Sequence, residues 1–344
     1  MKTVIVTGVT GQDGSHMVDY LLKNTDYMIY GGVRRLSVTN HKNIQHISSE
    51  RFKIIDLDSS DPQSINNAVL TYKPDYFINF AANSFVGTSW EMPFVHMQCN
   101  AVSVMHQLEA IRKIVPNCRY YNAGSSEEFG DVVTVPQSES HPLRPRSPYG
   151  ASKASARHIV KVWRDSYKLF AIQGWLFNHE GVRRGSEFVT RKISLGVAKI
   201  KKAISAGGKV EPILLGNLDA KRDWSDAEDF VDGVWKMLNH SVAKEYVLSS
   251  NETHTVREFV ELAFAAAGIE GYWLGQKGTV EEVFLEKNSK TILVQINAAY
   301  FRPAEVEVLL GDSTLARKEL GWTPKTSFFQ LVKKMVDNDL QNNG

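Results

Sequence analysis

The chain has 344 residues, of which 43% are hydrophobic and 23% are charged, the balance of a folded protein with a sizeable core. Forty Lys and Arg stand against 38 Asp and Glu, and this net charge of +2 argues against a dedicated nucleic-acid binder or a polybasic membrane protein. The two cysteines, Cys99 and Cys118, exclude a disulfide framework and a zinc finger. The opening apolar stretch is too short for a signal peptide, and no apolar run approaches the roughly 18 residues of a membrane span. We therefore expect a cytoplasmic protein of two packed lobes, without a metal.

Short apolar runs alternate with amphipathic segments over the first half of the chain. Strands are predicted at 4–7, 27–31, 52–55, 76–80, 119–123 and 171–177, and helices at 14–23, 101–115 and 152–167. This alternation implies a parallel sheet covered by helices on both faces, with right-handed crossovers. The pattern predicts a Rossmann-type, doubly wound α/β domain.

The rhythm changes after residue 177, where polar and basic loops surround a predicted helix at 188–205. A strand at 246–249 is expected to return to the large sheet, and helices are predicted at 256–267, 313–319 and 328–339. No Pro/Gly/Ser-rich linker separates the halves, so the second, smaller α/β lobe should pack directly on the first. We expect the Rossmann domain to hold residues 1–177 and about 222–250, and the substrate lobe about 178–221 and 251–344. The site should lie between them, at the carboxyl ends of the strands.

The first predicted strand runs directly into a glycine-rich turn that precedes the first helix. Glycines at three-residue spacing permit a tight turn, close approach of a pyrophosphate and close packing of helix on strand. The helix N-terminus then supplies free N–H groups and a positive dipole end. A purely structural turn is the alternative, but the position between the first strand and the first helix favours dinucleotide binding. The residues expected to contact the cofactor are Gly8, Thr10, Gly11, Gln12, Asp13 and Gly14.

The end of the second predicted strand indicates which dinucleotide is bound. An NAD site carries Asp or Glu there for the ribose 2′-hydroxyl, whereas this chain has Arg34 and Arg35. Two guanidinium groups suit a 2′-phosphate, so NADP is the predicted cofactor, with a solvent-exposed basic turn as the alternative. Residues after the third and fourth strands are expected to line the adenine and ribose: Asp56, Leu57, Ala81, Ala82 and Ser84.

Tyr149 and Lys153 are four residues apart on a predicted helix and therefore share one face. A tyrosine near its ordinary pKa of about 10 is a poor base at neutral pH. A lysine ammonium and a positive nicotinamide favour the phenolate and lower that pKa. The pair is predicted to take a proton from a sugar hydroxyl while hydride leaves the same carbon. The spacing alone is common by chance, and the glycine-rich turn makes it specific.

Polar residues follow the fifth predicted strand directly. The hydroxyl of Ser125 can bond the substrate oxygen being oxidised, and Glu127 is an acid/base candidate beside the nicotinamide. A simple dehydrogenase needs no such carboxyl group, so Glu127 indicates further chemistry. We interpret Glu128 as part of a solvent-exposed turn.

These residues resemble the extended short-chain dehydrogenase/reductase family, and within it the nucleotide-sugar 4,6-dehydratases of the GDP-mannose group. Besides the turn at 7–14, the matching stretches are 32–35, 79–84, 125–130, 149–153, 176–180, 183–193, 215–224 and 300–311. The resemblance implies a hydro-lyase that converts GDP-mannose to GDP-4-keto-6-deoxymannose, the first step towards GDP-fucose. It implies oxidation at C4, elimination of water across C5 and C6, and return of hydride to C6. NADP is then tightly bound and recycled within each turnover.

The resemblance also implies roles for single residues. Ser125, Glu127, Tyr149 and Lys153 match the catalytic set, and His179 and Arg184 match residues beside the cofactor. Positions implied to bind the nucleotide sugar are Ser84, Ser125, Ser126, Glu127, Asn178, Val189, Lys192, Leu215, Gly216, Lys221, Arg222, Arg302 and Glu305. The cations among them suit a diphosphate, although each is also compatible with a surface position, and His179 with a packed interior one. A homodimer or homotetramer is implied, with the loop at 35–43 reaching a neighbouring subunit.

Several positions depart from the family pattern near the sugar and phosphate. Ser125 stands for a usual Thr, Phe129 for Tyr, 181–182 for Ser-Pro and 297–299 for an Asp-Pro-Arg-like run. The sugar therefore stays open, for instance to a heptose in place of mannose. A 4-keto-sugar reductase or a C4 epimerase is the alternative within the superfamily, since neither needs a carboxylate at position 127. A non-catalytic NADP-binding regulator is the other alternative, and would be expected to lose Tyr149, Lys153 or Glu127.

Overall fold

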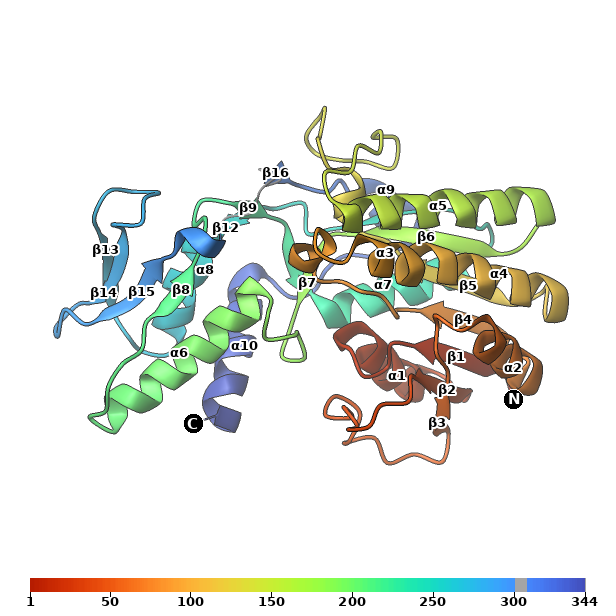
Figure 1. Cartoon of the computed structure of the whole chain (residues 1–344), viewed down its shortest axis with the longest axis horizontal. Helices are drawn as coiled ribbons and strands as arrows, with labels where there is room; N and C mark the ends of the chain where they lie inside the picture. Colours follow the sequence, from red (N-terminus) through yellow and green to blue (C-terminus); the bar gives the residue numbers. More distant parts are fainter. Residues whose placement is uncertain (301–307, 344) are drawn as a thin grey trace.

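A parallel sheet of seven strands forms the centre of the larger lobe in the computed structural model, which describes residues 1–300 and 308–343 (Figure 1). The strand order is β11-β6-β5-β4-β1-β2-β3, so the order reverses between β1 and β4. Ligands of such sheets bind at this switch point, outside the carboxyl ends of the strands. The strands are β1 (Thr3–Thr7), β2 (Met28–Val33), β3 (Phe52–Asp56), β4 (Tyr76–Asn79), β5 (Arg119–Ala123), β6 (Ala171–Leu176) and β11 (Val247–Leu248). The predicted α/β architecture is confirmed.

Helices cover both faces of this sheet, because successive strand residues point to opposite sides. On β1, Val4 and Val6 pack with α1 (Gln12–Asn24) and α7 (Ala227–Asn239). Ile5, on the other face, packs with α2 (Pro62–Tyr72), α4 (Ser103–Ile114) and α5 (Pro148–Tyr167). The helix predicted from residue 101 begins earlier, since α3 (Pro93–Met97) continues through a π-helical turn at Gln98–Val102 into α4.

The smaller lobe has its own apolar core, built between three helices and a four-stranded sheet. The helices are α6 (Val189–Ser205), α8 (Val256–Ala266) and α10 (Phe328–Asn343). The sheet has the order β13-β14-β15-β8, with β13 (Gly271–Leu274), β14 (Val283–Glu286), β15 (Ile292–Ile296) and β8 (Ile213–Leu215). An α/β lobe was expected here, but its individual strands were not predicted.

Short strands lie where the two lobes meet (Figure 1). There β7 (Asn178–Glu180) pairs with β10 (Trp224–Asp226), and β9 (Lys221–Arg222) lies between β12 (His254–Thr255) and β16 (Val308–Leu309). The chain then returns to the larger lobe, where α7 packs on α1 and β11 pairs with β6, and α9 (Thr314–Leu320) contacts both α7 and β11. In the parts of the chain that the structure describes, no helix has the length and apolar character to cross a membrane. The domain boundaries given above stay a prediction.

Candidate active site

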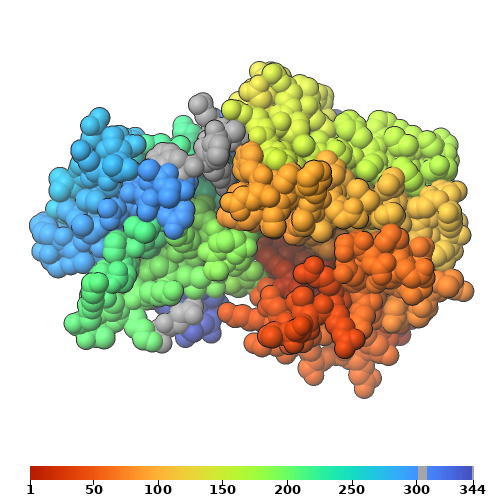
Figure 2. Space-filling model, viewed as in Figure 1, coloured from red at the N-terminus to blue at the C-terminus, as the bar shows by residue number. Residues whose placement is uncertain are grey.

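A cavity of about 1540 Å³ lies between the lobes, at the carboxyl ends of the central strands. Figure 2 shows a recess at this position, with residues of the N-terminal part of the chain at its bottom. The volume exceeds the usual 300–1,000 Å³ of a site for one small ligand, so two ligands have room side by side. Nine Lys and Arg and six Asp and Glu line it, an excess of positive charge that favours anionic ligands.

The glycine-rich turn forms one wall of this cavity, and two of its glycines have no room for a side chain. Gly8 has a φ of +69°, and a Cβ atom there would lie 2.8 Å from the backbone nitrogen of Ala81. A Cβ on Gly14 would lie 2.3 Å from the carbonyl oxygen of Gly8. Helix α1 begins at Gln12, and its first backbone N–H groups have no partner within the helix. All six turn residues expected to contact the cofactor line the cavity.

The residues expected around the adenine and ribose divide into two groups. Arg34, Leu57, Ala81, Ala82 and Ser84 line the cavity. Arg35 and Asp56 do not, and both are exposed. Asp56 is the last residue of β3, and its side chain points away from the side that the buried Leu57 occupies. Asp58, which follows Leu57, lines the cavity instead.

Tyr149 and Lys153 lie one turn apart at the start of α5. This helix begins at Pro148 rather than at residue 152, because Ser147 caps it by accepting a hydrogen bond from the Gly150 N–H at 3.0 Å. Lys153 Nζ donates to the carbonyl oxygen of Ala123 at 2.8 Å. It lies 5.9 Å from the centre of the Tyr149 ring.

Burial dominates the titration of this pair. It raises the pKa of Tyr149, and a hydrogen bond with Ser125 offsets part of that rise. Burial lowers the pKa of Lys153 to about 8, against the opposing negative charges of Glu128 and Asp13. The Ser125 hydroxyl thus favours the tyrosine phenolate, and the Lys153 ammonium lies near the same ring.

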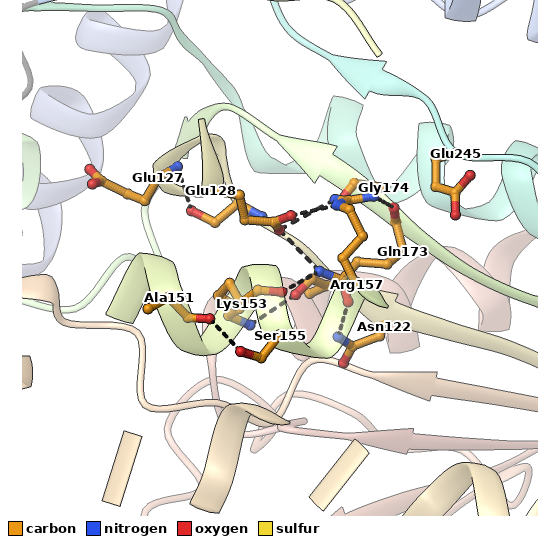
Figure 3. A network of polar contacts seen from close by, with 12 residues as sticks. Asn122, Glu127, Glu128, Ala151, Lys153, Ser155, Arg157, Gln173, Gly174 and Glu245 are labelled. Atoms are coloured by element: carbon orange, nitrogen blue, oxygen red, sulfur yellow. Dashed lines mark hydrogen bonds and ion pairs between the residues drawn. The ribbon is translucent and has the colours of Figure 1, made fainter. Parts of the chain in front are cut away.

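Ser125, Ser126 and Glu127 form the turn that faces Tyr149. Ser125 caps the 3₁₀ helix Ser126–Glu128, and its Oγ accepts a hydrogen bond from the Glu127 N–H at 3.2 Å. All three residues line the cavity, where the Glu127 side chain is half-buried. In Figure 3, the Glu127 side chain points away from the Glu128 side chain. A carboxyl group next to a serine and a tyrosine hydroxyl can move protons on a bound ligand.

The interpretation of Glu128 as a solvent-exposed turn residue is wrong. Its side chain is 0% exposed and forms an ion pair with Arg157 of α5, with 2.5 Å between Oε2 and Nε. The carboxylate also folds back to accept a hydrogen bond from the Ser125 N–H at 2.8 Å. A buried carboxylate is retained only with such partners, and its main partner lies 29 residues further along the chain.

His179 joins the glycine-rich turn to β7. Its Nε2 lies 2.8 Å from Oδ2 of Asp13, and its ring stacks on Phe230 at 4.7 Å between centroids. His179 is thus packed between Asp13 and Phe230 and also lines the cavity, and its place beside the cofactor stays a prediction. Arg184 lies four residues after Glu180, the last residue of β7. It pairs with Glu180 at 3.0 Å and lies 3.6 Å over the Phe188 ring.

The smaller lobe contributes a second set of expected residues to the cavity lining. These are Asn178, Val189, Lys192, Leu215, Gly216 and Arg222. Lys221 does not line it, because it is exposed and alternation in β9 turns it away from the side that the buried Arg222 occupies. Arg302 and Glu305 lie outside the described residues.

Sequence reasoning missed several lining residues. Lys192 Nζ lies 3.6 Å over the ring of Tyr300, which also lines the cavity. Lys199 lines it too, and its place seven residues after Lys192 on α6, two turns on and on the same face, was a usable signal. Among the described residues, Lys192, Lys199 and Arg34 make no ion pair with a carboxylate, which leaves their charges for an anionic ligand. The described residues hold no cluster of three His, Cys, Asp or Glu suited to a metal ion.

A doubly wound sheet, a glycine-rich first turn and a Ser/Tyr/Lys cluster at the strand ends define the extended short-chain dehydrogenase/reductase class. The sequence adds the narrower assignment, since the family model described as GDP-mannose 4,6 dehydratase matches residues 5–335. The chain belongs to this family, whose members are hydro-lyases.

Relatives agree with this assignment, and a solved structure shares the fold. The chain is 42% identical to a GDP-mannose 4,6 dehydratase of Drosophila melanogaster, over 99% of this chain and 86% of the relative. It is 38% identical to a GDP-mannose 4,6 dehydratase of Homo sapiens, over 99% and 92%. The crystal structure of DesIV, a dTDP-glucose 4,6-dehydratase from Streptomyces venezuelae, superposes with a TM-score of 0.82 at 21% identity, over 100% of this chain and 98% of that one.

Proposed function

We propose that this chain converts GDP-mannose to GDP-4-keto-6-deoxymannose, with NADP as a cofactor that each turnover regenerates. The observation that carries the proposal is the Glu127 side chain in the cavity lining, next to Ser125 and Tyr149. A 4-keto-sugar reductase or a C4 epimerase has no use for an acid/base group there, whereas water elimination does.

The residues of the larger lobe fit a phosphorylated dinucleotide. At Gly8 and Gly14 there is no room for a side chain, so a ligand can approach the backbone there, and the N-terminus of α1 offers unpaired N–H groups to a pyrophosphate. Arg34, exposed at the end of β2 and lining the cavity, suits the 2′-phosphate that distinguishes NADP from NAD. When bound, the cofactor supplies an acceptor for hydride from C4 and a donor of hydride to C6.

Tyr149 and Ser125 serve the oxidation at C4. The Tyr149 phenolate takes the proton of the C4 hydroxyl, and Ser125, hydrogen-bonded to Tyr149, orients that oxygen. Lys153 keeps its ammonium near the phenol ring and favours the ionised form.

Glu127 serves the elimination. Once C4 is a carbonyl, the proton on C5 is acidic because the resulting carbanion is an enolate. The Glu127 carboxylate removes this proton, and the same group, now protonated, donates a proton to the C6 hydroxyl as it leaves as water. Hydride at C6 and a proton at C5 then complete the product, so atoms and electrons balance with no net use of cofactor.

Cations of the smaller lobe suit the diphosphate of the nucleotide sugar. Lys192 and Lys199 on α6 and Arg222 on β9 line this side of the cavity. Charged hydrogen bonds from such groups to phosphate are roughly twice as strong as neutral ones. Mannose is the proposed sugar, and a heptose is the alternative that the departures at 181–182 and 297–299 leave open.

We also propose that the chain forms a homodimer or homotetramer, and a cytoplasmic location stays a prediction. An exposed apolar segment supports assembly: Phe94 of α3 is 87% exposed, and Met92, Val95 and Met97 beside it are also exposed. A surface of this kind is typical of a protein contact.

The test is to incubate the purified protein with GDP-mannose and analyse the product by mass, with a GDP-heptose as the competing substrate. We expect a product lighter by one water, formed without added reduced cofactor. A product of unchanged mass would indicate an epimerase, and a strict need for stoichiometric NADPH would indicate a reductase.

A further inference from the structure

A row of polar side chains crosses the central sheet directly below the active site. Thr7, Asn79, Asn122 and Gln173 are register partners on the adjacent strands β1, β4, β5 and β6. Thr7 Oγ1 donates to Asn79 at 2.5 Å, Asn79 Nδ2 to Asn122 at 2.7 Å, and Asn122 Nδ2 to Gln173 at 2.7 Å. Each donor points the same way, so the hydrogen bonds polarise one another along the row.

The row ends on the carboxylate of Glu128 (Figure 3). Gln173 Nε2 donates to Glu128 Oε1 at 3.0 Å, and the same amide group donates to the carbonyl oxygen of Lys153, also at 3.0 Å. Arg157 donates to Glu128 through Nε at 2.5 Å and Nη2 at 3.3 Å, and through Nη1 to the carbonyl oxygen of Gln173 at 2.6 Å. The guanidinium also lies 3.4 Å over the Trp175 ring, so its position is fixed on two sides.

Glu128 and Arg157 connect the two elements that carry the chemistry. Glu128 belongs to the turn with Ser125, whose backbone N–H it binds, while Arg157 lies one helical turn after Lys153 on α5. Neither Glu128 nor Arg157 lines the cavity, so neither touches a ligand there. Both side chains are nearly inaccessible, at 0% and 6% exposed.

We infer that the Glu128–Arg157 pair is a positioning unit, which holds the turn of Ser125 and Glu127 in register with Tyr149 and Lys153. This inference rests on the proposed function, because it concerns the same site. A buried ion pair is a poor source of stability, since desolvation cancels most of its attraction. Its use here is geometric: two parallel donors of a planar guanidinium fix the carboxylate in distance and in orientation. A displacement of about 1 Å between reacting groups is enough to cost roughly 10²-fold in rate.

The test compares Glu128→Gln and Glu128→Asp with the wild type. Gln keeps the length and loses the charge, while Asp keeps the charge and is too short to reach both Ser125 and Arg157. We expect kcat with GDP-mannose to fall by about 10–100-fold in both variants, and KM to stay within about 3-fold, because the ligand contacts are intact. Arg157→Lys keeps the positive charge but loses the two parallel donors of the guanidinium. Its kcat should lie between those of the wild type and Glu128→Gln.

Glu282→Gln is the matched control, because Glu282 is also a nearly inaccessible carboxylate, 3% exposed, that is held by an arginine and a backbone N–H. It accepts from Arg257 at 2.6 and 3.1 Å and from the Gly278 N–H at 2.8 Å, in the smaller lobe and outside the cavity lining. This variant should lose stability to a similar degree and keep kcat within about 2-fold. Hydrogen exchange of the peptide around 123–130 should speed up in Glu128→Gln only, since the Ser125 amide loses its charged acceptor.

Each outcome decides the inference separately from the proposed function. A wild type that does not dehydrate GDP-mannose refutes the function, whereas the exchange measurement still tests the positioning. With an active wild type, kcat within 2-fold in both Glu128 variants overturns the inference. So does an equal loss of kcat in Glu128→Gln and Glu282→Gln. Failure of both Glu128 variants to fold, while Glu282→Gln folds, would make the pair a folding element and would also overturn it.

Discussion

Asp13 and His179 form an ion pair within the cavity lining, with 2.8 Å between Oδ2 and Nε2. Asp13 lies in the first turn of α1, and His179 lies on β7, where the chain leaves the larger lobe. The pair therefore ties the dinucleotide-binding turn to the start of the substrate lobe, across 166 residues of sequence.

This pair should make stability depend on pH in two windows. Burial would raise the pKa of Asp13, but the charge and hydrogen bond of His179 lower it from 3.8 to about 2. Burial would lower the pKa of His179, but the charge and hydrogen bond of Asp13 raise it above 6.5. The stabilisation from Asp13 is present above pH 3.8 and is lost towards pH 2, while that from His179 is present below pH 6.5 and is lost above the raised pKa.

Asp13→Asn should accordingly cost most between pH 3.8 and 6.5 and less on either side. Denaturant unfolding of wild type and variant at pH 3, 5.5 and 8.5 measures this cost. In a His179→Gln background the decrease of this cost above pH 6.5 should vanish, because that decrease comes from the titration of His179. A cost that is constant with pH in the wild-type background would refute the coupling.

Lys153 should make stability increase with pH, whereas the contribution of His179 is lost as pH rises; comparison of the wild type with Lys153→Met tests this. Burial lowers the pKa of Lys153 from 10.5 to about 8, so the unfolded chain binds more protons than the folded one between these values. Wild-type stability therefore rises relative to that of the variant as pH increases from 8 to 10.5. Melting temperatures across this range test the sign, which would be reversed if an ion pair rather than burial governed Lys153.

Tyr149→Phe keeps the buried ring and removes only the proton acceptor. Turnover of GDP-mannose should fall by at least about 10², the usual contribution of a general base. Tyr246→Phe is the control, since that hydroxyl bonds Glu319 at 2.7 Å, outside the cavity lining. Near-normal turnover of Tyr149→Phe would mean that another group deprotonates the sugar.

Arg34→Ala should weaken NADP binding more than NAD binding, by about 1–3 kcal/mol for a lost charged hydrogen bond. Arg35→Ala should have a smaller effect, because Arg35 does not line the cavity. Titration calorimetry with each dinucleotide measures the difference. Equal weakening of NADP and NAD by Arg34→Ala would remove the basis for NADP preference.

Local sequence patterns were sufficient to predict the fold of the larger lobe. A continuous apolar run such as 76–80 indicates a strand that is buried on both faces, and the apolar periodicity at 14–23 indicates a helix that covers one face. Together they predict a parallel sheet covered by helices. The motifs at the strand ends then follow from topology, since parallel strands bring Gly8, Ser125 and His179 to one edge. Helix starts were less accurate, as at Ser147, where the cap lies outside the apolar pattern.

Contacts between residues far apart in the chain could not be predicted from local sequence patterns. Glu128 lies in a polar stretch, a pattern that predicts an exposed side chain. Its partner Arg157 is brought to it only by the packing of α5. The strands β13 to β15 are short and partly exposed, so no alternation stands out over them. Which of two adjacent residues faces a cavity, as with Arg34 and Arg35 or Lys221 and Arg222, depends on local backbone direction that periodicity of a few residues does not fix.

The most direct test of the central claim is single turnover of GDP-mannose by Glu127→Gln in deuterated water. Gln keeps the shape of the side chain and cannot exchange protons. We expect this variant to bind GDP-mannose and NADP, to show the absorbance of reduced nicotinamide, and then to stall with no loss of water. The wild type should release 4-keto-6-deoxy sugar that carries deuterium at C5. Release of that deuterated product by Glu127→Gln at the wild-type rate would contradict the role given to Glu127.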